Sequence, residues 1–131
     1  MKKLFLLTIT VGIIATGCTK VKDILTIKAI YNAASFTEKN CDQLSGLKSL
    51  NSFDTVNITF TNHSKRLLHI NWIDYNGSEM SYKDLEDGTS WTIPTYLTHV
   101  WIIRKTDNAC STILIPKTGA GTNETVSFGE Q

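Results

Sequence analysis

The residues of this chain with the widest chemical capability lie within one short stretch, TYLTHVWIIR at residues 95–104. The Thr95 hydroxyl can donate and accept a hydrogen bond, and the His99 imidazole does either according to its tautomer. His99 and Trp101 are two positions apart, so on a strand their side chains share one face. Because polar groups are costly to bury without partners, these residues either pack with partners in the core or line a site. A hydroxyl, an imidazole and an indole together suit recognition of one hydroxyl group on an apolar ring.

The sequence contains none of the short motifs that mark common enzyme classes. A G-x-S-x-G elbow, an H-E-x-x-H pair, a phosphate-binding loop and an obvious carboxylate pair are all missing. The three histidines, His63, His69 and His99, are scattered and have no C-x-x-C partner, so we expect neither a metal site nor a cofactor. We therefore expect a protein that is not an enzyme and has no catalytic residues.

Residues 1–17 have the organisation of a secretory signal. Two lysines precede an apolar run from Leu4 to Ile14, and small residues follow it before Cys18. The run is too short and wrongly flanked for a transmembrane span. A cysteine directly after the small residues resembles a bacterial lipoprotein signal, although Ala15 stands where leucine is usual. We expect cleavage before Cys18, lipidation of Cys18, and anchoring in the bacterial cell envelope at the outer membrane or periplasmic face. An ordinary signal peptide and an uncleaved anchor are the alternatives.

Charge and cysteine content limit the partners and the compartment. The formal net charge is +1, and cleavage would remove two lysines and no acidic residue, so no nucleic-acid partner is expected. Cys41 and Cys110 then form an even pair in an oxidising compartment, which predicts a disulfide between them. Two buried free thiols are the alternative.

From residue 55 onward the pattern is that of short strands separated by turns. TVNITFTN alternates apolar and polar residues, and Asn76-Gly77 is a strong hairpin signal. Gly88 is free to adopt a positive φ, and Pro94 places its strand at an edge or at a kink. Seven such strands predict an all-β fold, a seven-stranded β-sandwich over residues 55–131. We expect residues 18–54 to be an N-terminal linker or extension, a short irregular or helical segment in which residues 21–34 form either a short helix or a strand.

Two consecutive segments, FTNHSKRLLHINWIDYNG and SYKDLEDGTSWTIPTYLTHVWIIRK, share a frame with a known family. Its fixed positions are Phe60, Asn62, Ser64, Trp72, Gly77, Tyr82, Leu85, Gly88, Thr95, Tyr96, His99, Trp101 and Arg104. This pattern resembles the β-domain of the von Hippel–Lindau (VHL) tumour suppressor family. The resemblance implies a seven-stranded β-sandwich, in agreement with the strand pattern.

The resemblance also implies a site. The family's β-domain binds a hydroxyproline within an extended peptide, and its pocket walls match Trp72, Tyr82 and Trp101. The residues that bind the hydroxyl match Thr95, a serine in the family, and His99. At the pocket rim, Pro94 replaces a histidine, and Trp91 and Thr92 replace two arginines. The family's second, helical domain has no counterpart in this sequence, so elongin and ubiquitin-ligase partners are not expected.

The sequence thus predicts a lipid-anchored module that binds an extended, proline-containing segment of an unknown envelope protein or peptide. Two alternatives stay open: a structural or accessory envelope domain with a filled pocket, and a carbohydrate-binding module that uses Trp91 or Trp101 as a stacking platform. An open cavity bounded by Trp72, Tyr82 and Trp101 would favour binding, whereas rings packed shut against one another would favour a structural role. An exposed Trp91 far from that cavity would favour a carbohydrate ligand.

Overall fold

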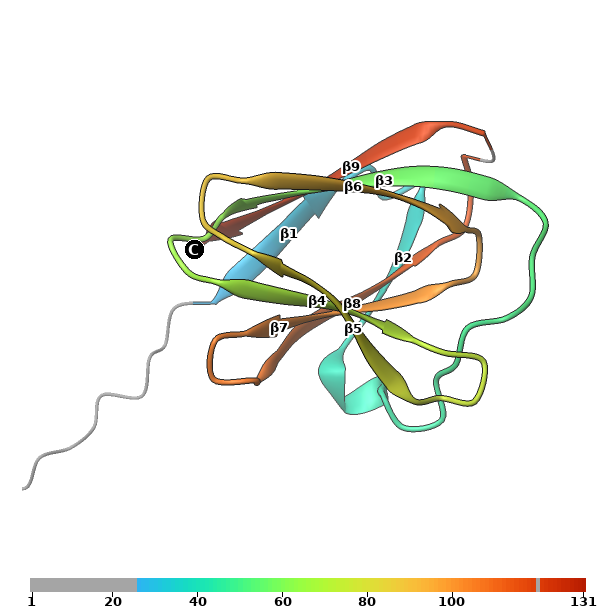
Figure 1. Cartoon of the computed structure of the whole chain (residues 1–131), viewed down its shortest axis with the longest axis horizontal. Coiled ribbons are helices and arrows are strands. Elements are labelled where there is room, and N and C mark those ends of the chain that lie inside the picture. The colour runs from blue at the N-terminus through green and yellow to red at the C-terminus, as the bar shows by residue number, and fades with distance from the viewer. Residues whose placement is uncertain (1–25, 120) are drawn as a thin grey trace, which may run out of the picture.

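The computed structural model describes residues 26–119 and 121–131, so the predicted signal segment 1–17 and Cys18 lie outside the described residues. The described chain forms two mainly antiparallel sheets that face each other, as Figure 1 shows. This confirms the predicted all-β sandwich. Its elements are β1 (Ile27–Tyr31), β2 (Phe36–Lys39), η1 (Cys41–Gln43), β3 (Thr55–His63), β4 (Leu68–Ile73), β5 (Glu79–Leu85), β6 (Ser90–Tyr96), β7 (Val100–Lys105), β8 (Cys110–Pro116) and β9 (Asn123–Glu130). In this part of the chain no helix is long and apolar enough to span a membrane.

The sandwich has more strands than the seven predicted. All seven expected strands form, as β3 to β9, but β1 and β2 add to them from the segment expected to be a linker or extension. The four-stranded sheet has the order β1-β9-β3-β6, and the five-stranded sheet has the order β2-β8-β7-β4-β5. The residues of β1 and β2, which lie within the predicted N-terminal linker or extension 18–54, are therefore part of the sandwich. Within residues 21–34, the strand alternative holds at Ile27–Tyr31, where Ile27 and Ala29 are buried and Lys28 and Ile30 are exposed.

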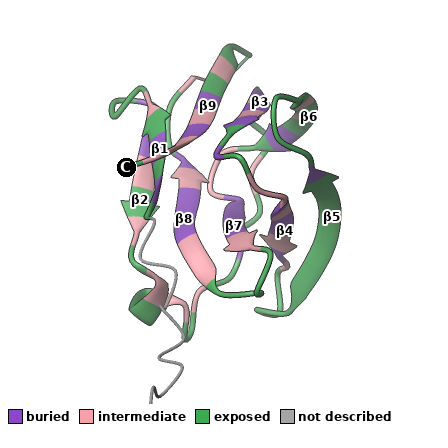
Figure 2. Cartoon of the chain, turned by 90° about the vertical axis from the view of Figure 1, so that its left-hand side faces the viewer, coloured by how far each residue is buried: buried purple, intermediate pink, exposed green. Residues whose placement is uncertain are grey.

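The main core lies between the two sheets. Strand β3 alternates as predicted, with Val56, Ile58 and Phe60 buried against the opposite sheet. Figure 2 shows the contrast between β7, which is buried along most of its length, and β5, which is exposed along nearly all of its length. β5 is an edge strand with one face on the solvent, whereas β7 lies in the middle of its sheet and is covered on both faces.

A second, smaller apolar cluster covers the outer face of the five-stranded sheet. It contains Ile73, Val100, Ile102 and Ile113, with Leu44, Leu47, Cys110 and Ile115 packed against it. The segment from η1 to residue 50 therefore acts as a cover for this face. Buried Ser49 ties the cover to the sheet, because its hydroxyl donates to the Ile73 carbonyl and accepts from the Val100 amide at 2.9 Å.

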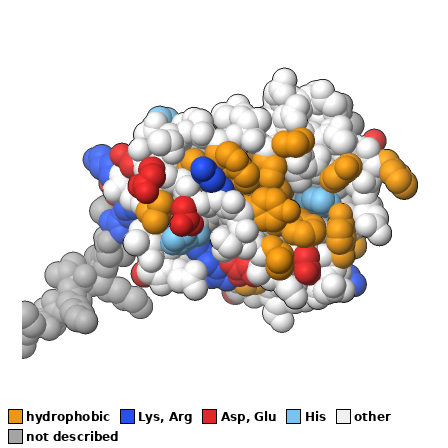
Figure 3. All heavy atoms as spheres, in the orientation of Figure 1, with side chains coloured by type: hydrophobic (Ala, Val, Ile, Leu, Met, Phe, Trp, Pro, Cys, Tyr) orange, Lys and Arg blue, Asp and Glu red, His pale blue; other side chains and the backbone are white. Residues whose placement is uncertain are grey.

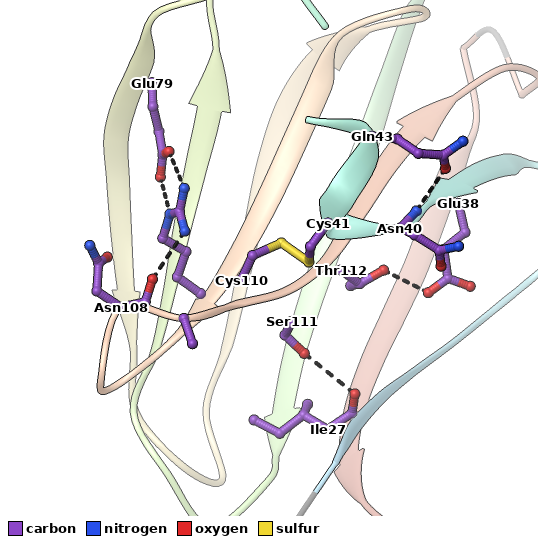
Figure 4. The surroundings of a disulfide bond; sticks show 12 residues. Ile27, Glu38, Asn40, Cys41, Gln43, Glu79, Asn108, Cys110, Ser111 and Thr112 are labelled. Carbon is purple, nitrogen blue, oxygen red and sulfur yellow. Dashed lines mark hydrogen bonds and ion pairs between the residues drawn. A yellow bond between two sulfur atoms is a disulfide. The ribbon is translucent and has the colours of Figure 1, made fainter. Parts of the chain in front are cut away.

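A disulfide fixes the start of this cover. Cys41 in η1 and Cys110 at the start of β8 are bonded, with Cα atoms 5.9 Å apart, which confirms the predicted pairing (Figure 4). Next to it, the Thr112 hydroxyl donates to a Glu38 carboxylate oxygen at 2.6 Å and joins β8 to β2. The disulfide thus attaches the N-terminal segment to the sheet at a sequence separation of 69 residues.

Replacing both Cys41 and Cys110 by serine is expected to lower the free energy of unfolding. The chain-entropy model gives a loss of up to about 4 kcal/mol for a loop of this length. Urea denaturation of the variant and of the oxidised wild type measures the loss. Reductant should destabilise the wild type by a similar amount and leave the variant unchanged. Equal midpoints for the variant and the oxidised wild type would contradict the prediction.

Candidate functional site

A cavity of about 230 Å³ opens between the two sheets at one side of the sandwich. It lies between β5, an edge of the five-stranded sheet, and β6, an edge of the four-stranded sheet. Figure 3 shows hydrophobic side chains gathered in a band on this view of the surface, with a histidine among them. The lining residues are Trp72, Tyr75, Tyr82, Ile93, Pro94, Thr95, Tyr96, His99 and Trp101. All five residues predicted for the pocket thus contribute to one cavity.

A chain of three hydrogen-bonding groups forms the polar part of the wall. The Thr95 hydroxyl lies 3.1 Å from His99 Nδ1, and the Tyr75 hydroxyl lies 3.0 Å from His99 Nε2. Burial lowers the pKa of His99 below its ordinary value, so the imidazole is neutral at neutral pH. A neutral imidazole has one donor and one acceptor, and here both ring nitrogens already have partners within the protein.

Tyr75 is a site residue that the sequence prediction missed. It stands three residues after Trp72, just before the predicted Asn76-Gly77 turn. That turn forms as expected between β4 and β5, with Gly77 at a φ of 86° and the Asp74 carboxylate accepting from the Asn76 and Ser78 amides at 2.8 Å. The turn places the phenol over the cavity, where its ring contacts both Trp72 and His99. The only signal in the sequence was an aromatic residue in a hairpin turn next to a predicted wall residue.

The turn between β6 and β7 positions His99. Thr98 has a φ of 69°, a left-handed conformation that is unusual for a β-branched residue. Two hydrogen bonds to other parts of the chain hold it: its amide donates to the Pro116 carbonyl at 2.8 Å, and its hydroxyl donates to the Leu50 carbonyl at 3.0 Å. The cover segment therefore reaches the site, since Leu50 follows directly after Ser49. These contacts fix the backbone from which the His99 ring projects.

Aromatic rings in edge-to-face contact form the apolar walls. Trp72 meets Tyr82 at a centroid distance of 6.1 Å and a 75° angle, and Tyr82 meets Trp101 at 5.2 Å and 84°. Trp72 also lies 5.3 Å from the His99 ring. Such contacts hold rings in defined orientations. Tyr82 forms the outer wall, because it lies on the edge strand and is 48% exposed.

Trp101 belongs to the core as well as to the cavity. Its residue is only 2% exposed, and its ring packs 5.9 Å from Phe60 in the centre of the sandwich. The two readings of Trp101 left open by the sequence, core and pocket, both hold: the indole is core on one side and cavity floor on the other. Trp91 was predicted at the rim but is not among the lining residues, because it stacks on Phe60 at 6.2 Å. Pro94, the other predicted rim residue, does line the cavity and lies on an edge strand as expected.

Other fixed positions of the family pattern stabilise the fold and do not line the cavity. Buried Asn62 donates to the carbonyls of Arg66 and Leu85 at 2.7 Å, and its side-chain oxygen accepts from the amide and hydroxyl of Ser64. The Arg104 guanidinium donates two hydrogen bonds to the Glu79 carboxylate, at 2.6 and 2.7 Å. This pairing lowers the pKa of the Glu79 carboxyl. The Arg104–Glu79 pair joins β7 to the start of β5, the strand that carries the outer wall of the site.

Residues that could form a metal centre are not grouped in the described chain. No set of three or more His, Cys, Asp or Glu side chains comes together in residues 26–119 and 121–131. The His69–Asp84 pair, at 2.6 Å, joins the surfaces of β4 and β5 and is separate from the cavity lining.

The fold and the cavity define a β-sandwich domain with an aromatic-walled recess between its edge strands. The VHL beta domain family model matches residues 47–118, more than half of the chain, and the chain therefore belongs to the VHL beta domain family. The match begins inside the cover segment, earlier than the predicted start at residue 55, and it includes every residue that lines the cavity. The VHL beta domain is a substrate-recognition module and not an enzyme family.

Trp101→Ala is expected to lower the free energy of unfolding by about 3–5 kcal/mol, as removal of a buried aromatic ring does. Tyr82→Ala, which removes the exposed wall, should cost about 1 kcal/mol or less. Chemical denaturation monitored by circular dichroism measures both. A Trp101→Ala variant as stable as the wild type would contradict the assignment of this ring to the core.

Proposed function

We propose that the chain is a protein-binding module whose cavity accepts a proline-like ring from an extended segment of a partner. The observation on which the proposal rests is a cavity with three aromatic walls and one polar wall, located between two edge strands. Its volume of about 230 Å³ is below the range of about 300–1,000 Å³ that is usual for whole small ligands, so a single side chain fits it better. Membership of a family of substrate-recognition domains supports a protein partner.

Edge strand β5 supports the extended form of the bound segment. An edge strand has backbone N–H and C=O groups that can pair with an added strand, and Tyr82 points from this edge toward the cavity walls. On the opposite side, Pro94 in β6 lacks a backbone donor, which favours pairing along β5.

An accessory domain without a ligand is the second candidate. It is favoured by the same hydrogen bond that closes the polar wall, since the Tyr75 hydroxyl already occupies His99 Nε2. A carbohydrate platform has less support, because Trp91 is partly buried on Phe60 rather than exposed away from the cavity.

The module acts in the bacterial cell envelope, anchored through a lipid on Cys18. The support for this part of the proposal is the signal-like sequence of residues 1–17 followed by Cys18. The Cys41–Cys110 disulfide agrees with an oxidising compartment. The partner would then be an envelope protein or peptide within reach of the membrane.

Capture of peptides by the full chain in detergent tests the binding function. A displayed library of unstructured peptides is selected on the wild type, and the affinity of the enriched peptides is compared between variants. Tyr82→Ala should weaken binding by about tenfold or more, as loss of an aromatic anchor does. Phe53→Ala is the matched control, because Phe53 is a fully exposed aromatic residue that does not line the cavity. Equal binding by the wild type and Tyr82→Ala would refute this site, and no enrichment at all would favour the accessory domain.

Cys18→Ala tests the anchor. In a bacterial host fed a fatty-acid probe, the wild type should incorporate the label and sediment with membranes, because several acyl chains anchor a protein stably. The variant should lose both properties. A variant that still takes up the label would show that Cys18 is not the acylated residue.

A further inference from the structure

We propose that the cavity selects an unmodified proline ring over a hydroxylated one, and that Tyr75 is the residue that determines this specificity. The inference rests on the proposed function and concerns which ring the cavity accepts. It follows from the position of the Tyr75 hydroxyl, 3.0 Å from His99 Nε2. A hydroxyl on the ligand would need that same nitrogen, because Thr95 already occupies His99 Nδ1.

Counting donors and acceptors gives the same result for either tautomer of the neutral His99 ring. If Nδ1 holds the proton, it donates to Thr95, and Nε2 accepts from the Tyr75 hydroxyl. If Nε2 holds the proton, it donates to Tyr75, and Nδ1 accepts from the Thr95 hydroxyl. In both cases no ring nitrogen is free, and one hydroxyl proton, on Thr95 or on Tyr75, is left to donate. One remaining donor suits a carbonyl oxygen of a peptide.

A ligand hydroxyl can accept from this one remaining donor, as a carbonyl oxygen does, but no free imidazole nitrogen is left to accept its own proton. To reach the imidazole it must displace Tyr75, which exchanges one hydrogen bond for another and gives no net bond. The ligand hydroxyl also loses its hydration when it enters the recess, and the other walls there are the rings of Trp72, Tyr82 and Trp101. An unmodified ring has no such cost, since its C–H groups pack on the aromatic faces.

Tyr96 provides the contrast within the same site. Tyr75 and Tyr96 are exposed to similar extents, 43% and 41%, and both rings pack against His99. In the described chain the phenol that bonds the imidazole is that of Tyr75. Removing each hydroxyl in turn therefore separates its hydrogen bond from the packing of the ring.

The test uses the full chain in detergent and two small probes, N-acetyl-proline methylamide and its trans-4-hydroxy analogue. Nuclear magnetic resonance follows the tryptophan indole and His99 ring signals of the wild type, Tyr75→Phe and Tyr96→Phe during titration. The wild type should bind the proline amide more tightly than the hydroxylated amide. Tyr75→Phe should shift this ratio about three- to tenfold toward the hydroxylated amide, the worth of one hydrogen bond to a newly free nitrogen. Tyr96→Phe should leave the ratio unchanged.

The outcomes separate this inference from the proposed function. A wild type that prefers the hydroxylated amide, or a Tyr75→Phe ratio equal to that of the wild type, overturns the selection. The wild type alone also gives a test. If the hydroxylated amide perturbs the His99 ring signals of the wild type more than the proline amide does, the proposed selection is overturned. If neither amide binds, the inference fails, while Tyr82-dependent capture of library peptides still upholds the binding module. If an amide binds with the expected ratios and no peptide is captured, the selection holds and the extended-peptide function fails.

Discussion

The packing of one indole ring between the core and the cavity is the interaction on which the site depends. Trp101 lies in the central strand β7, with Phe60 of the opposite sheet on one side and Tyr82 of the edge strand on another. The core fixes the ring, and the ring fixes the floor against which the outer wall stands. The cavity floor is therefore held rigid by the hydrophobic core. Because the floor is already ordered, ligand binding costs little conformational entropy there.

Much of the fold could be predicted because its signals are local. The alternation in β3, the Asn-Gly turn after β4 and the even cysteine pair each depend on residues near one another or on a simple count. For β1 the sequence left a helix and a strand open, and β2 was missed, because strands of only five and four residues carry little signal of their own. Their strand character comes from pairing with β9 and β8, partners about eighty to a hundred residues away in sequence.

The site was predictable to the extent that strand parity and the family frame decide it. Thr95, His99 and Trp101 come together as expected, and so do Trp72 and Tyr82. Tyr75 was not predicted because its role depends on the path of a turn, which fixes where a phenol points only after the hairpin forms. The prediction that Trp91 lies at the pocket rim failed for a different reason. It shares the inward face of β6 with Thr95 but stands four residues earlier, so it lies over Phe60 instead of at the opening.

The pairing of the earliest described strands with the latest ones has a consequence for the order of folding. β1 pairs with β9, and β2 pairs with β8, whereas β4 pairs with β5 in a hairpin and with β7 across a shorter stretch of chain. Such non-local pairings raise the contact order and slow folding, because a long loop must close before the contacts form. Until the last strands arrive, one edge of β3 and one edge of β7 have no partner. A chain that emerges vectorially, from a ribosome or through a membrane, therefore passes through a period with two open sheet edges, and that is the interval in which aggregation or capture by a chaperone competes with closure of the sandwich.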